Sequence, residues 1–324
     1  MSDEDLRQLF SDAASDIRPR GSLEDILERT KKTDPTARRW FLPAVAAATV
    51  IGFVIGGAVW LANDSGTPHN SGPAGSPSSG PTAAETVTEV QAYYAGASTY
   101  AGGHSLFVET HDLSNVTDGP RMAAQETVSG KPEDPDYFSL WPKGVKVDEV
   151  TLHGGAKQTI TVALSGLTDG ALTALGTRDE ALAVEAVVRT VQAFYGVTAE
   201  VSFTAGPGVQ DLQGQSFTAG DDNVIMAPVE ISSPSNGETV AAGDVPVVGN
   251  ASTFEANVVW ELLVGGDAVV QQGHTTAAEC CKLSPFGFTI KDVKPGTYTL
   301  VVHDEDMSGS GKPVNQDTKE IVVQ

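Results

Sequence analysis

LWPKGVKVDEVTLHGGAKQTITVALSG, residues 140–166, carries the clearest local structural signal in this 324-residue sequence. Two runs within it, 145–152 and 159–164, alternate apolar and polar side chains as half-buried β-strands do. Between the runs, Gly154 and Gly155 supply the backbone freedom that a tight hairpin turn requires. The segment therefore predicts a β-hairpin.

The sequence on both sides of this hairpin predicts a small α+β domain spanning residues 84–208. Residues 179–195 place apolar side chains at helical spacing, and Gly196 follows them, as is typical of a helix C-terminus. The other expected elements are strands at 86–94, 104–110 and 198–203 and a polar helix at 119–129. This composition predicts a sheet covered by helices on one face.

Three motifs of this domain resemble the GerMN family, which is named for spore-germination and sporulation proteins. They are the hairpin segment quoted above, the helix end VRTVQAFYGV and the strand AEVSF. The resemblance implies a noncatalytic module of the bacterial envelope, similar in outline to domains that build rings and other assemblies.

Residues 223–324 show a different pattern, in which short apolar runs alternate with turn residues. The runs lie at 229–232, 239–240, 245–249, 257–264, 268–272, 286–290, 298–303 and 319–323. This pattern predicts an all-β immunoglobulin-like sandwich. Trp260 is expected in its core, and Tyr298, which follows Pro295-Gly296, is expected to form a tyrosine corner.

Four segments of this second domain resemble the Gmad2 immunoglobulin-like domain. They read ISSPSNGETV, VVGNASTFEANVVWEL, PFGFTI and PGTYTLVVHDED. Because Gmad2 domains often follow GerMN domains, the two resemblances support each other.

Residues 41–62, FLPAVAAATVIGFVIGGAVWLA, predict a single transmembrane helix. At about 1.5 Å per residue the segment spans roughly 33 Å, enough to cross a bilayer core of about 30 Å. Basic residues precede it, namely Lys31, Lys32, Arg38 and Arg39. The positive-inside rule therefore places residues 1–40 in the cytoplasm and the later domains outside the plasma membrane. A cleaved signal peptide is the alternative, which the long polar lead disfavours.

The expected fold class is thus multidomain: a single transmembrane helix, then a small α+β GerMN-like domain and an all-β immunoglobulin-like sandwich. Residues 1–40 are expected to form two short amphipathic helices. They resemble the leaders of membrane proteins that restrain sigma factors, but contain no His or Cys. Residues 63–83 are rich in Gly, Ser and Pro and predict a solvated linker.

Most of the negative charge lies after the predicted membrane segment. The whole chain has a formal net charge of −22, and residues 63–324 hold 33 acidic and 12 basic side chains, a net of −21. Such a surface repels nucleic acid and anionic lipid, which excludes nucleic-acid binding as a function.

No motif predicts a catalytic, cofactor-binding or metal-binding residue. The histidines lack the spacing of metal ligands; they are His69, His104, His111, His153, His274 and His303. Residues 309–313, GSGKP, do not fit the phosphate-binding loop. The acidic run from Asp304 to Asp306, together with Asp317, offers oxygen ligands for Ca²⁺, although a solvated loop is the more typical role.

Cys280 and Cys281 are adjacent in the sequence and are its only cysteines. Three states are open at this stage: a strained vicinal disulfide, reduced thiols, or a bond to another chain. An extracytoplasmic location would permit oxidation.

These features predict a noncatalytic, membrane-anchored envelope protein whose outer domains bind or assemble with protein or cell-wall partners, self-association of the protein included. One alternative is an anti-sigma-like transmembrane regulator, in which residues 1–40 bind a transcription factor and the outer domains act as a sensor. A second alternative is a cell-wall hydrolase.

Overall fold

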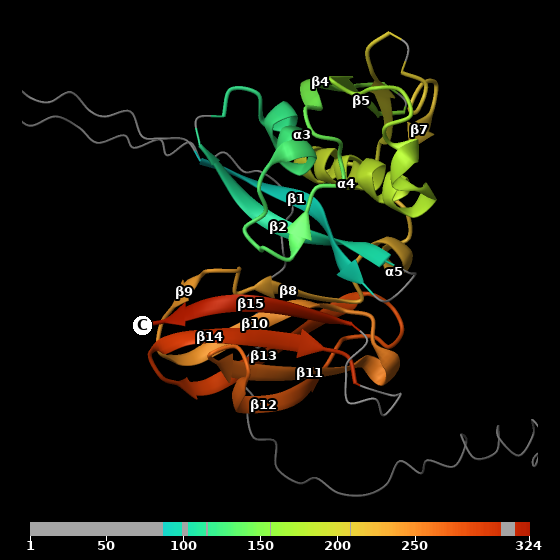
Figure 1. The fold of residues 1–324 in the computed structure, drawn as a ribbon. Coiled ribbons are helices and arrows are strands. Elements are labelled where there is room, and N and C mark those ends of the chain that lie inside the picture. The colour runs from blue at the N-terminus through green and yellow to red at the C-terminus, as the bar shows by residue number, and fades with distance from the viewer. Residues whose placement is uncertain (1–86, 99–102, 115, 156, 208, 306–314) are drawn as a thin grey trace, which may run out of the picture. The chain divides into compact units, whose positions relative to one another are not determined.

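The computed structural model describes residues 87–98, 103–114, 116–155, 157–207, 209–305 and 315–324 (Figure 1). The predicted cytoplasmic leader, transmembrane helix and linker lie outside these residues. Within the described ranges, no helix combines the length and the apolar composition needed to cross a bilayer.

The first folded region has helices packed between two β-sheets (Figure 1). One sheet has the order β2-β1-β3 and consists of β1 (Val87–Ser98), β2 (Gly103–Ser114) and β3 (Tyr137–Phe138). The other has the order β4-β5-β6-β7 and consists of β4 (Lys146–His153), β5 (Thr159–Ser165), β6 (Glu200–Thr204) and β7 (Ser216–Phe217). The helical elements are α3 (Gly119–Ser129), the 3₁₀ turn η2 (Thr173–Leu175) and α4 (Thr177–Tyr195).

The second sheet corrects the prediction of one sheet with helices on one face. Helix α4 is buried around most of its circumference, so other elements cover it on two sides. Leu182 and Ala186 pack against Leu106 of β2, whereas Val187 and Val191 join the core of the β4–β7 sheet. The hairpin of β4 and β5 thus closes the far side of α4.

The predicted ends of the two helices and the predicted hairpin of this region are confirmed. Gly196 ends α4 in the left-handed conformation, with φ of 63°, and its N–H donates to the Ala193 carbonyl. Helix α3 has the predicted bounds; the Asp118 side chain caps its first turn, and it ends before Gly130. The β4–β5 hairpin pairs antiparallel as expected.

The second folded region is a β-sandwich, as predicted. Its smaller sheet has the order β13-β10-β8, with β8 (Val229–Ser233), β10 (Gly243–Ala251) and β13 (Ser284–Val293). Its larger sheet has the order β12-β11-β14-β15-β9, with β9 (Thr239–Val240), β11 (Asn257–Val264), β12 (Ala268–Thr276), β14 (Gly296–His303) and β15 (Gln316–Val323). Short helical turns, α5 (Asp222–Ile225) and η3 (Phe254–Ala256), lie before β8 and β11.

The sequence predicts the positions of two aromatic residues in this sandwich, and the structure confirms one prediction and corrects the other. Tyr298 forms the expected corner, because its hydroxyl donates to the Lys294 carbonyl at 3.0 Å. Trp260 lies at the margin of the core rather than in its centre: it is half-buried and stacks on Phe288 with ring centroids 5.0 Å apart. Val258 and Leu262, on the same face of β11, occupy the fully buried positions.

Replacing Val187 with Ala tests the position of α4 between the sheets. Val187 is fully buried, so V187A should reduce the free energy of unfolding by about 2 kcal/mol through lost burial and an unfilled cavity. Urea unfolding followed by circular dichroism measures this. V270A makes the same chemical change at a side chain that is 48% exposed and should cost less than about 0.5 kcal/mol. Equal losses in the two variants would contradict the packing described here.

Candidate functional site: a buried polar junction

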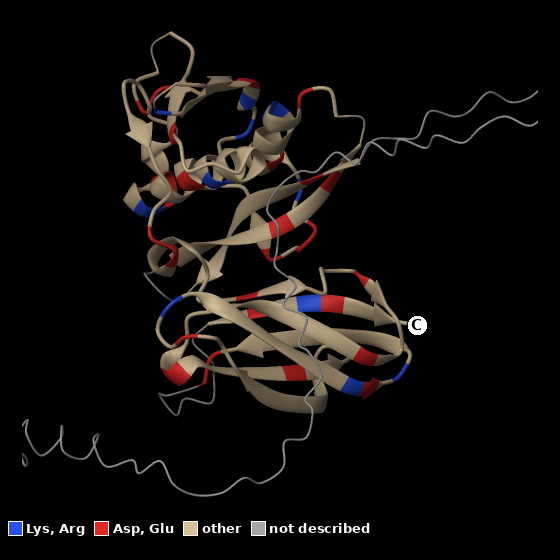
Figure 2. Ribbon diagram, turned by 180° about the vertical axis from the view of Figure 1, so that it is seen from behind, with Lys and Arg blue, Asp and Glu red and all other residues tan. Residues whose placement is uncertain are grey.

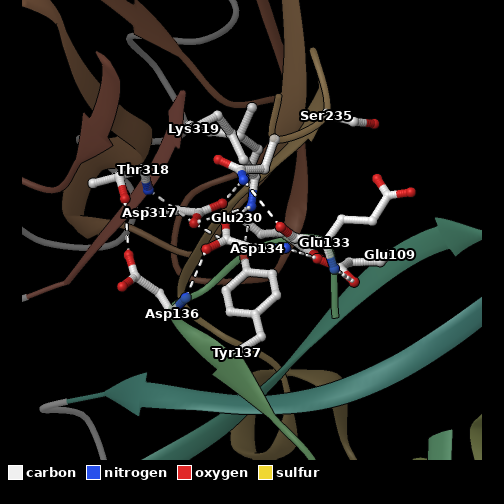
Figure 3. A network of polar contacts seen from close by, with 12 residues as sticks. Glu109, Glu133, Asp134, Asp136, Tyr137, Glu230, Ser235, Asp317, Thr318 and Lys319 are labelled. Carbon is white, nitrogen blue, oxygen red and sulfur yellow. Dashed lines mark hydrogen bonds and ion pairs between the residues drawn. The ribbon is translucent and has the colours of Figure 1, made fainter. Parts of the chain in front are cut away.

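The two folded regions meet at a group of buried polar side chains, called here the junction cluster (Figure 3). Its members are Asp134, Tyr137, Glu230, Asp317 and Lys319, and each is no more than 6% exposed. In the first region, Asp134 lies just before β3 and Tyr137 lies on β3. In the second region, Glu230 lies on β8, and Asp317 and Lys319 lie on β15. Buried charges at such a density require partners, and the cluster supplies them across the boundary.

Lys319 is the cation of the cluster. Its Nζ lies 2.7 Å from Asp134 Oδ2, 2.6 Å from the Tyr137 hydroxyl and 3.4 Å from Asp317 Oδ1. The same ammonium group lies 4.3 Å from the centroid of the Tyr137 ring. Burial opposes the charge on Lys319, but Asp317 and Asp134 outweigh this effect and raise its pKa. Lys319 is therefore charged and joins the two regions.

Asp317 is held by donors from both regions. Its Oδ1 accepts the Tyr137 hydroxyl at 2.8 Å, and its Oδ2 accepts the Ile231 N–H at 2.7 Å. Burial raises the pKa of the Asp317 carboxyl, and it raises the pKa of Tyr137 well above its ordinary value. Tyr137 is therefore neutral, so it can both donate to Asp317 and accept from Lys319.

Glu230 connects the second region to the edge of β2. The side chain is 1% exposed, and its Oε1 accepts the Val108 N–H at 2.5 Å. Nearby, the Ala227 N–H donates to the Leu106 carbonyl at 2.8 Å. Burial raises the pKa of the Glu230 carboxyl to about 8, so at neutral pH the group is mostly uncharged.

A second set of charges, in the first region, holds the segment that carries Asp134. The Glu109 carboxylate accepts the N–H groups of Glu133 at 3.0 Å and Asp134 at 2.8 Å. His111 lies between two carboxylates, with Nε2 2.8 Å from Glu109 and Nδ1 3.0 Å from Glu126. Burial would lower the pKa of His111, but hydrogen bonds to these two glutamates raise it to about 9. The charged imidazole therefore links α3 to the junction cluster through Glu109.

Comparison with protein-family models gives two matches. Residues 91–206 match the Germane model, described as "Sporulation and spore germination", and residues 228–310 match Gmad2, described as "Immunoglobulin-like domain of bacterial spore germination". The first match lies in the first folded region and the second in the β-sandwich, so these two regions, β15 included, are called here the Germane domain and the Gmad2 domain. Both resemblances drawn from the sequence are confirmed, and the junction cluster lies between domains associated with spore germination.

Comparison with solved structures gives a match to the tandem GerMN domains of the sporulation protein GerM from Bacillus subtilis, at 13% identity and a TM-score of 0.31. That match covers 41% of this chain and 45% of the other, so the chain spans less than half of that structure. A putative lipoprotein from Clostridium perfringens matches at 13% identity over 41% of this chain and 87% of the other, with a TM-score of 0.24. The CARDB domain of the PF1109 protein from Pyrococcus furiosus matches at 12% identity over 30% of this chain and 85% of the other, with a TM-score of 0.20. A search of curated proteins found no match.

No sequence motif predicted the junction cluster, although the residue pattern of β15 is consistent with it. In QDTKEIVV the side chains of Asp317 and Lys319 share the face of the buried Ile321 and Val323. Charged residues in the inward register of a strand need buried partners. That register indicated a buried polar contact but not its partners, which lie 180 and 185 residues away in the Germane domain.

The candidate calcium ligands are not brought together. Asp317 lies in the junction cluster, whereas the Asp304 carboxylate accepts the backbone and side-chain N–H groups of Asn315 at 3.1 and 2.7 Å. Asp306 lies outside the described residues. Within the described ranges, no three His, Cys, Asp or Glu side chains are grouped so that they could hold a metal ion.

The histidines and cysteines of the described residues that are named below lie apart from the junction cluster, and each has a partner of its own. His104 pairs with Asp179 at 2.9 Å, and His153 bonds to Thr161 at 3.0 Å. His69 lies outside the described residues. Cys280 and Cys281 are joined to each other in an exposed loop between β12 and β13, which is the first of the three states left open by the sequence.

Removing Lys319 should destabilise the protein strongly. K319M leaves Asp134 and Asp317 buried without their cation, and losing one partner of a buried pair costs about 3–5 kcal/mol. Urea unfolding of the purified protein measures this loss. K291M is the matched control, because Lys291 forms an exposed pair with Asp244 and water screens such a pair, so its loss should have little effect on stability. A K319M protein as stable as K291M would show that the buried contact does not form.

His111 should make the free energy of unfolding depend on pH between 6.5, the ordinary pKa of histidine, and about 9, the pKa of His111 in the folded protein. The folded pKa of about 9 exceeds the ordinary 6.5, so the stabilising contribution is complete below pH 6.5 and is lost as pH rises through about 9. H111Q should therefore be less stable than the wild type at pH 6.5, and this difference should shrink toward pH 9. Thermal melts across this range test it, with H153Q as an exposed control. A difference that stays constant with pH would contradict a charged His111.

Proposed function

We propose that this protein is a noncatalytic, membrane-anchored component of the bacterial envelope whose Germane and Gmad2 domains bind or assemble with protein or cell-wall partners. The observation that carries the proposal is the junction cluster, which connects two domains of spore-germination type through buried charges. Contacts between the domains of one chain are usually polar and allow domain motion. Here buried hydrogen bonds cross the boundary from Lys319 to Asp134 and from Val108 to Glu230.

Connected domains are suited to binding more than to catalysis. A surface that spans two domains binds with a smaller entropic cost when the domains are already ordered relative to each other. The bonds from Lys319 to Asp134 and from Val108 to Glu230 both restrict that relative motion. The described part of the chain thus offers a preorganised surface.

The acidic composition favours some partners over others. Figure 2 shows acidic residues on strands, helices and loops of both domains. With a net charge of −21 over residues 63–324, partners of neutral or positive surface are favoured, and nucleic acid is disfavoured.

The proposed location follows from residues 41–62, which have the length and composition of a membrane-spanning helix with the N-terminus inside. The linker at 63–83 would then give the Germane domain a reach of about 25 Å from the bilayer, taking a flexible chain of this length. That reach suits partners at the membrane surface or in the adjacent wall.

Proximity crosslinking in intact cells tests this function, using the full-length protein beside a version that lacks residues 2–30 and keeps the basic residues that precede the membrane segment. Envelope partners recovered equally with both versions are the expected result. A transcription factor that is captured only with residues 2–30 present would replace the proposal with the regulator. Release of fragments from purified peptidoglycan, abolished by replacing one carboxylate, would replace it with a hydrolase.

A further inference from the structure

Glu230 places a carboxyl group of the Gmad2 domain against the backbone of the Germane domain. The side chain is 1% exposed, and Oε1 accepts the Val108 N–H of β2 at 2.5 Å. A change in the charge of this carboxyl therefore acts directly on the contact between the two domains.

The polar groups around Glu230 come from several elements of both domains. They are Tyr93 on β1, Glu109 on β2, Asp134 before β3, Tyr137 on β3, and Asp317 and Lys319 on β15. Among these described groups Lys319 is the one cation, and its Nζ already contacts Asp134 at 2.7 Å and Asp317 at 3.4 Å. An ionised Glu230 adds a further negative charge to a buried site where the carboxylates already outnumber the cation.

We propose that the junction is a proton-dependent latch, closed while Glu230 carries a proton and opened when this carboxyl ionises. Closed, the neutral carboxyl accepts from Val108 without repelling Asp317. Ionised, it is buried beside Asp317 while Lys319 is already shared, so separation of the domains and hydration of the carboxylate become favourable.

The direction of the pH effect follows from Glu230 and is reinforced by His111. Burial and the Asp317 charge raise the pKa of Glu230 from 4.5 to about 8, so the closed state is complete at low pH and weakens as pH rises through about 8. His111, which supports Glu109 and hence the backbone of Asp134, loses its proton at about 9. Both changes favour opening at alkaline pH.

Opening changes what the protein presents to its surroundings. The Val108 N–H loses its acceptor, so this position on the edge of β2 becomes unpaired. The latch would thus couple the proton concentration outside the membrane to the exposure of this edge.

Energy transfer between two dyes on the full-length protein tests the latch. The dyes are attached through unnatural amino acids at Lys143 in the Germane domain and Asp267 in the Gmad2 domain, both exposed. In the wild type the distance between the dyes should increase with a midpoint near pH 8. A distance that stays constant through pH 9 would overturn the proposal.

E230Q is the decisive variant, because glutamine keeps the acceptor for Val108 but does not ionise. Its opening should shift toward pH 9, where His111 deprotonates, whereas the exposed E320Q control on β15 should open as the wild type does. An E230Q protein that opens with the wild-type midpoint would rule out Glu230 as the latch.

A measurement on the wild-type protein keeps the proposal testable if E230Q does not fold. Carbon NMR of protein labelled at the glutamate carboxyl should show one protonated glutamate at neutral pH that titrates near pH 8. A spectrum in which every glutamate is ionised at neutral pH would refute the latch.

Discussion

A buried ammonium group needs acceptors close to it. Lys319 belongs to the Gmad2 domain, but the carboxylate nearest to its ammonium group is that of Asp134 in the Germane domain. Asp317, in its own strand, is more distant and is itself partly satisfied by Tyr137 from the other domain. The buried Asp134 carboxylate of the Germane domain is therefore balanced by a cation of the other domain. This requirement explains the polar part of the boundary, which lies beside two buried apolar clusters that join Leu106 to Met226 and Phe107 to Ala227.

The junction extends into the Germane domain because Asp134 lies on a loop that has to be held. Glu109 accepts two backbone N–H groups of that loop, and His111 neutralises Glu109 while reaching Glu126 on α3. The result is a continuous path of charge-assisted bonds from α3 to β15. Such networks are sensitive to protonation, since the loss of one charge leaves its buried neighbours without a partner.

The sequence predicted those features of the fold that depend on local chemistry. The bounds of α3, the left-handed Gly196 and the Tyr298 corner all follow from a few neighbouring residues. The arrangement of sheets around α4 did not follow, because an amphipathic pattern says which side chains are buried but not how many layers bury them. The same holds for Trp260. The sequence predicted its position along β11 but not its distance from the centre of the core.

By itself, the sequence determined the element types, the order of the two domains and their families, because periodicity, turn residues and motifs depend on residues that are close together in the sequence. Only the tertiary structure determined the junction cluster. Its residues are spread from Asp134 to Lys319, and their pairing depends on how two separately folding cores approach each other. Whether a buried carboxyl such as Glu230 carries a proton was likewise decided in three dimensions, since its pKa reflects solvent exclusion and neighbouring charges that no local pattern contains.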